Sequence, residues 1–124
     1  MLLVDDDRNF VATMRRILTT NNFNVTVAYN SEQCFNRLKR KKPDLIILDI
    51  MMEKTGSGFD VCRKIKQNEE TRNIPIIILS AIDRVHPFKF ASVSGDEDWL
   101  PADIFLSKPI DARTLIQHIK RCLR

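Results

Sequence analysis

The chain has 124 residues, of which 44% are hydrophobic and 29% are charged, and its formal net charge is +4. This length fits one domain with a real core, and this composition excludes an intrinsically disordered chain. No apolar run is long enough to cross a bilayer, and the N-terminus lacks the features of a signal peptide. We therefore expect a single cytoplasmic domain over residues 1–124, without membrane association.

The positive charges are spread along the chain, except for a Lys-Arg-Lys-Lys run at residues 39–42. Cations are favoured at a helix C-terminus, so we interpret this run as a solvated helix end and expect no nucleic-acid binding. Cys34, Cys62 and Cys122 are odd in number and fit no metal-ligand spacing. We expect them to be buried, reduced thiols on the apolar faces of helices.

The first half of the chain alternates apolar runs with amphipathic segments. Residues 2–4 are apolar and lead into three aspartates, and a helix is expected to follow and to end at Asn21 and Asn22. The apolar face of this helix carries Phe10, Met14, Ile17 and Leu18. Residues 25–28 form a β-branched strand, and Ser31 is expected to cap a second helix. Residues 45–48 are continuously apolar, which fits a strand buried on both faces of a parallel sheet.

The second half repeats the alternation. A third helix is expected to bury Val61, Cys62 and Ile65, and two further strands are expected at residues 76–80 and 104–106. Asp111 is expected to cap a last helix. The residues expected on its inward side are Leu115, Ile119, Cys122 and Leu123. Five strands that alternate with four clear helices predict a doubly wound α/β domain with a five-stranded parallel sheet.

Polar residues stand where the predicted strands end. Asp5 and Asp6 follow the first strand, Asp49 the third, Ser80 ends the fourth and Lys108 comes just after the fifth. Ligands of open parallel sheets bind at the carboxyl ends of the strands, so we expect these side chains at one edge. Each alone could be an ordinary turn or cap residue. All of them together, in this order and at the strand ends, indicate a functional site much more specifically than any one of them does.

Three clustered carboxylates repel one another and favour a bound cation. Mg²⁺ suits oxygen ligands and phosphate chemistry best, so it is the expected cofactor. A carboxylate beside such a metal can attack an activated phosphoryl group, and Ser80 and Lys108 would offset the charge on the transferring oxygens.

Four stretches of the chain resemble the response regulator receiver domains of two-component signalling. They are LVDDD (3–7), LIILDIMM (45–52), ILSA (78–81) and FLSKP (105–109). The resemblance covers essentially the whole chain and implies a flavodoxin-like (βα)5 fold. It implies that Asp49 accepts a phosphoryl group, and that Asp6, Asp49 and the backbone carbonyl of Met51 hold Mg²⁺, with Asp5 acting mostly through a water.

The resemblance also assigns the remaining roles. Ser80 would bond a phosphoryl oxygen, Lys108 would pair with it, and Phe105 occupies the position of an aromatic switch residue. The phosphoryl group would come from a phosphohistidine on a histidine kinase or a histidine phosphotransfer protein. The domain would catalyse its own aspartyl phosphorylation and dephosphorylation, and would signal by a conformational change and by binding an unidentified downstream protein.

Two segments depart from the family pattern. Glu53 stands where the family usually has proline, and one extra residue falls within residues 54–56. Residues 81–103 are long, contain Pro87, Gly95 and Pro101, and show no helical period, so we expect the fourth helix to be shortened or replaced by a long loop. The aromatic residues of this segment either cover the sheet or form a recognition surface for the downstream partner.

Two other functions compete with phosphoryl acceptance. An interaction module with the same fold but no phosphoryl chemistry is possible on fold alone. A phosphate-ester hydrolase with an aspartyl-phosphate intermediate would need a second aspartate two residues after the nucleophile, where this chain has Met51.

Overall fold

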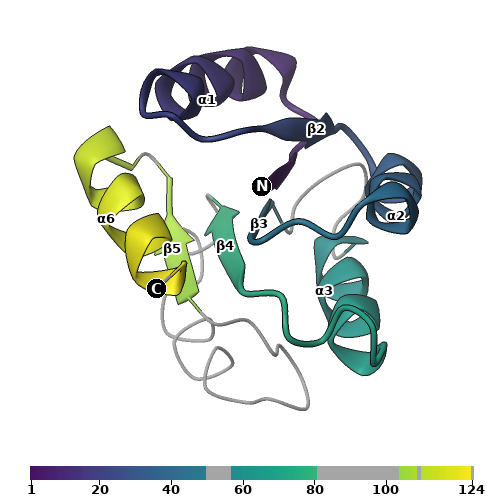
Figure 1. The fold of residues 1–124 in the computed structure, drawn as a ribbon. Coiled ribbons are helices and arrows are strands. Elements are labelled where there is room, and N and C mark those ends of the chain that lie inside the picture. Colours follow the sequence, from purple (N-terminus) through teal and green to yellow (C-terminus); the bar gives the residue numbers. More distant parts are fainter. Residues whose placement is uncertain (50–56, 81–103, 109, 124) are drawn as a thin grey trace.

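The computed structural model describes residues 1–49, 57–80, 104–108 and 110–123, and this part of the chain forms an α/β domain with a central parallel sheet (Figure 1). The strands are β1 (Leu2–Val4), β2 (Thr26–Ala28), β3 (Ile46–Leu48), β4 (Ile76–Ser80) and β5 (Ile104–Ser107). The helices are α1 (Arg8–Thr20), α2 (Ser31–Arg40), α3 (Ser57–Gln67) and α6 (Ala112–Cys122). The predicted doubly wound α/β fold is confirmed.

The sheet order is β2-β1-β3-β4-β5, and each neighbouring pair is parallel. Helices cover both faces: α1 and α6 lie on one side of the sheet, and α2 and α3 lie on the other (Figure 1). Successive strand residues therefore point into two separate cores. In β1, Leu2 and Val4 belong to the core beneath α2 and α3, whereas Leu3 belongs to the core beneath α1 and α6.

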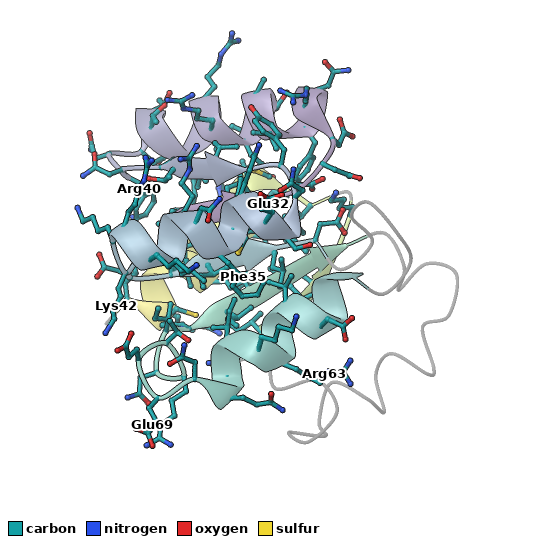
Figure 2. All side chains as sticks on the ribbon, turned by 90° about the vertical axis from the view of Figure 1, so that its right-hand side faces the viewer. Glu32, Phe35, Arg40, Lys42, Arg63 and Glu69 are labelled. Carbon is teal, nitrogen blue, oxygen red and sulfur yellow. The ribbon has the colours of Figure 1, made fainter. Side chains whose placement is uncertain are left out.

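The two central apolar strands are buried on both faces, as their composition predicted. Residues 45–49 and 76–79 are all buried, and Ile46 pairs with Ile76 in register. On the α2 and α3 side, Phe35 is half-buried, packs against this core and lies between the two helices (Figure 2). Such burial leaves the polar residues at the strand ends as the places where chemistry can occur.

The helix termini are fixed by side-chain caps. Asp7 caps α1, and its carboxylate accepts hydrogen bonds from the backbone N–H groups of Asn9 and Phe10. The helix ends at Asn21, and Asn22 has a φ of 70°, in the left-handed region that asparagine tolerates. The predicted Ser31 cap is wrong: Asn30 Oδ1 accepts the hydrogen bond from Gln33 N at 2.8 Å, and Ser31 is the first helical residue.

The C-terminal helix confirms one expected cap and corrects one inward residue. Asp111 accepts from the backbone N–H of Thr114, and Leu115 and Ile119 are fully buried. Leu123 was expected to face inward, but it is 40% exposed because α6 ends at Cys122 and Leu123 is the C-cap residue. The expected change in the fourth helix falls on residues 81–103, outside the described residues.

The cysteines and the basic run lie close to where the sequence placed them. Cys34 and Cys62 are buried as predicted, whereas Cys122 is only half-buried, and none of the three is part of a disulfide bond. Burial raises the pKa of the Cys34 thiol to about 12. Arg40 and Lys42, which belong to the basic run, are exposed at the C-terminal end of α2 (Figure 2). Among the described residues, no helix is both long enough and apolar enough to span a membrane.

The different burial of Leu115 and Leu123 gives a direct test of how α6 packs. Leu115→Ala should lower the free energy of unfolding by about 2–5 kcal/mol, because it empties a fully buried position. Leu123→Ala should change it by no more than about 0.5 kcal/mol, because the side chain is exposed. Urea unfolding followed by circular dichroism measures both values. Equal effects of the two substitutions would contradict this arrangement of α6.

Candidate functional site

Three carboxylates meet at the carboxyl edge of the sheet. Asp5 follows β1 and Asp49 follows β3, and the pairing of Val4 with Leu48 sets these two aspartates side by side. The backbone supports this register, because Asp49 N donates to the carbonyl of Val4 at 2.9 Å. One carboxylate oxygen from each of Asp5, Asp6 and Asp49 lies within 4.8 Å of the others. Asp5 and Asp49 are buried, and Asp6 is exposed.

Lys108 reaches the same place from the end of β5. Its Nζ donates to Asp5 Oδ2 at 2.8 Å and lies 3.6 Å from Asp49 Oδ2. A buried carboxylate is tolerated only when a cation or several hydrogen bonds compensate its lost hydration. Lys108 therefore supplies the positive charge that makes the two buried aspartates possible.

The formal charges of these four side chains do not balance. Three carboxylates against one ammonium leave a formal charge of −2 when all are ionised. The pKa of Asp5 is raised from 3.8 to about 6, mainly because burial disfavours its charged form. The charge of Asp49 raises it further, whereas the hydrogen bonds from Lys108 and from the backbone N–H of Asp7 lower it.

The donor set fits a hard divalent cation. The three acceptors that cluster among the described residues are carboxylate oxygens, which Mg²⁺ and Ca²⁺ prefer, and the cysteines of this part of the chain lie in the cores. The exposed Asp6 gives such an ion a side open to water, which suits Mg²⁺ because that ion keeps several of its waters. Burial raises the pKa of Asp5, and a cation bound beside it would favour its charged form.

The remaining predicted site residues are placed only in part. Ser80 is the last residue of β4 and pairs with Ser107 of β5, and Phe105 lies in β5 opposite Ile78. The positions of their side chains, and of Met51 as a whole, lie outside the described structure. The expected differences at residues 53–56 also fall outside it. The structure thus brings together Asp5, Asp6, Asp49 and Lys108, and the roles of these four residues and of Met51, Ser80 and Phe105 all stay predictions.

Two residues that the site analysis of the sequence did not include also contribute. Asp7 N donates to Asp5 Oδ1 at 3.0 Å, so the residue that caps α1 also holds a site carboxylate. The ring of Phe10 lies with its centroid 4.0 Å from Lys108 Nζ. Phe10 was assigned to the apolar face of α1, and nothing in that pattern indicated its second contact with Lys108.

A carboxylate cluster and a lysine at the carboxyl edge of a β2-β1-β3-β4-β5 parallel sheet define a flavodoxin-like domain of the receiver class. The family model of the response regulator receiver domain matches residues 1–120. The chain therefore belongs to the response regulator receiver domain family, which acts in two-component signalling.

Individual relatives support this assignment. The response regulator MprA of Mycobacterium leprae is 32% identical over 124 residues, which are 100% of this chain and 50% of that protein. The chain thus spans about half the length of the curated relatives it matches. The signal receiver domain of a histidine kinase from Syntrophus aciditrophicus has a TM-score of 0.80 at 28% identity, over 98% of this chain and 87% of that one. The receiver domain of NtrX from Brucella abortus shares the fold, with a TM-score of 0.80 at 23% identity over 98% and 96% of the two chains.

The raised pKa of Asp5 predicts a pH dependence of stability in the absence of metal. The folded state holds the Asp5 proton more tightly than the unfolded state, so the Asp5 contribution to the free energy of unfolding falls as pH rises from about 4 to about 6. Asp5→Asn cannot ionise, so its stability relative to the native protein should rise over the same window, by on the order of 2 kcal/mol, and then level off.

Urea unfolding in EDTA at several pH values between about 4 and 7 measures this difference. Asp44→Asn removes an exposed carboxylate just before β3, at the end of that strand opposite Asp49, and controls for the change in net charge. If the free energies of unfolding of Asp5→Asn and the native protein differed by a constant amount across the whole pH range, burial would not raise the pKa of Asp5.

Proposed function

We propose that Asp49 accepts a phosphoryl group from a phosphohistidine in a Mg²⁺-dependent reaction, as one step of a two-component phosphorelay. The observation that carries the proposal is the convergence of three carboxylates and the Lys108 ammonium at one edge of the sheet. A structural ion pair would need only one carboxylate for the lysine. Three carboxylate oxygens that converge within 4.8 Å of one another are, in contrast, the kind of donor set that a hard divalent cation prefers.

The metal set that the family resemblance implies is Asp6, Asp49 and the backbone carbonyl of Met51, with Asp5 acting mostly through a water. The clustered oxygens of the three aspartates support this set. Mg²⁺ bound there would supply positive charge to the transferring phosphoryl oxygens and would bring water ligands of its own. Asp6 is the exposed member of the cluster, so it can meet an incoming hydrated ion first.

The side chains of the chain would act as follows. An Asp49 oxygen forms the new bond to phosphorus while the bond between phosphorus and the histidine nitrogen of the donor breaks, which leaves an aspartyl phosphate. Lys108 lies 3.6 Å from Asp49 Oδ2, within reach of an oxygen of a group attached there. Ser80 would donate a hydrogen bond to another phosphoryl oxygen, and Phe105 would couple the new charge to a change in packing.

The partners follow from this chemistry. The donor would be a histidine kinase or a histidine phosphotransfer protein, and the output would pass to a downstream protein, with residues 81–103 as the proposed contact segment. The curated relatives are about twice as long as this chain. The proposed function therefore concerns the receiver domain, and the output of a longer protein that contains it also stays a proposal. The single-domain extent over residues 1–124 and the cytoplasmic location stay predictions.

The phosphoacceptor role can be tested directly. The native chain, incubated with Mg²⁺ and a small phosphodonor such as phosphoramidate, should gain one phosphoryl group, detected by intact-mass spectrometry. Asp49→Asn should gain none, because an amide cannot form the acyl phosphate. Asp44→Asn should be phosphorylated like the native chain. Equal labelling of Asp49→Asn would refute the assignment, and a folded native chain that takes no label would favour the interaction module.

Metal binding has a separate readout. Mg²⁺ at about ten times its dissociation constant should raise the free energy of unfolding by about 1.4 kcal/mol. Asp6→Ala should lose most of this gain, because Asp6 belongs to the carboxylate cluster. Asp44→Ala should keep it, because Asp44 does not belong to that cluster. Urea unfolding with and without MgCl₂ at constant ionic strength measures the effect. If Asp6→Ala gained as much stability as the native chain, Asp6 would not be a metal ligand.

A further inference from the structure

Among the residues that the structure describes, an aromatic ring as well as two carboxylates lies close to the Lys108 ammonium. Besides Asp5 Oδ2 at 2.8 Å and Asp49 Oδ2 at 3.6 Å, the centroid of the Phe10 ring lies 4.0 Å from Nζ. The face of an aromatic ring is electron-rich and attracts a cation within about 6 Å of the ring centroid. We propose that Phe10 is a positioning residue, whose ring keeps the Lys108 ammonium at the carboxylates. The inference rests on the proposed phosphoryl transfer and deepens it.

A series of contacts connects the Phe10 ring to the site and leads back to the ring. Phe10 N donates to Asp7 Oδ1 at 3.1 Å, and Asp7 N donates to Asp5 Oδ1 at 3.0 Å. Asp5 Oδ2 then accepts from Lys108, and Lys108 returns to the Phe10 ring. Phe10 also packs against the core beneath α1 and α6. The ring position relative to Asp5 is therefore set by a helix cap and by core packing.

Two other cation–π contacts in the described structure show why this one matters more. Arg8 lies 4.1 Å from the ring centroid of Tyr29, and Lys64 lies 5.8 Å from that of Phe35, but both of these cations are exposed. The Lys108 side chain is only 18% exposed. A cation–π contact strengthens when water is excluded from the cation, so the Phe10 contact should be the strongest of the three.

The functional consequence concerns the long side chain of Lys108. Lysine has a flexible four-carbon stem, and its ammonium is strongly hydrated, so it tends to move into water when nothing holds it. The Phe10 ring removes part of that freedom before the phosphoryl group arrives. The Lys108 side chain then loses less conformational entropy during the transfer, when its ammonium must face a newly charged oxygen.

Three variants separate this role from ordinary core packing. Phe10→Leu keeps an apolar side chain but removes the ring, and it should slow phosphorylation of Asp49 by a small phosphodonor about three- to tenfold. Phe10→Tyr keeps the ring and should restore the rate to within about twofold. Phe23→Leu is the matched control, because Phe23 is also half-buried and packs against the same core. It should leave the rate unchanged even if it lowers stability.

A spectroscopic measurement tests the contact without any phosphoryl chemistry. In the metal-free native protein, the ring current of Phe10 should move the NMR signals of the Lys108 CεH₂ group upfield. The signals should return toward random-coil values in Phe10→Leu and stay shifted in Phe23→Leu. If Phe10→Leu does not fold, fluorinated phenylalanines at position 10 keep the ring size while they weaken its attraction for cations, and the rate should fall as fluorines are added.

The outcomes distinguish this inference from the proposed function. A Phe10→Leu variant as fast as the native protein, or a Phe10→Tyr variant as slow as Phe10→Leu, would overturn the positioning role. An absent ring-current shift in a protein that is phosphorylated normally would also overturn it and leave the proposed function intact. A native protein that shows the shift but takes no phosphoryl group would overturn the proposed function, and with it the positioning role in transfer.

Discussion

The ion pair between Lys108 and Asp5 is the interaction on which the rest of the site depends. It joins residues 103 positions apart and connects the end of β1 to the end of β5. Without Lys108, Asp5 and Asp49 would lose the ammonium that contacts both of them, and removing one partner of a buried ion pair costs several kcal/mol. The described site can be held as one piece because a single ammonium reaches both of them.

The sheet order explains why the charges meet where they do. From β1 the chain goes out to β2 on one side, and then returns to place β3, β4 and β5 on the other side. The strand order therefore reverses between β1 and β3, which is where open parallel sheets form a binding crevice. Asp5 and Asp49 follow these two strands. The position of the cluster is thus a consequence of topology, and only the choice of residue type is specific to the chemistry.

Most of the fold and the centre of the site could be predicted from the sequence, because both depend on strong local patterns. Apolar runs gave the buried strands, and the residues just after them gave Asp5, Asp6, Asp49 and Lys108. The errors arose where neighbouring residues are chemically equivalent or where an element ends. Asn30 and Ser31 are both good caps, so only the backbone conformation decides between them. Whether Leu123 is buried depends on where the last turn of α6 ends, and pattern alone does not fix that.

The contact between Phe10 and Lys108 could not be predicted, because it joins two patterns that were interpreted separately as core and as site. It also bears on the proposed chemistry. A phosphoryl group adds about −1.5 to −2 charges beside three clustered carboxylates. Bound Mg²⁺ and a well-placed ammonium would both stabilise the phosphorylated state. By linkage, phosphorylation would then raise the affinity for Mg²⁺ by the same factor by which bound Mg²⁺ favours the phosphorylated state at equilibrium. A residue that fixes Lys108 would therefore strengthen the response of the domain to phosphorylation, although it touches neither the metal nor the phosphoryl group.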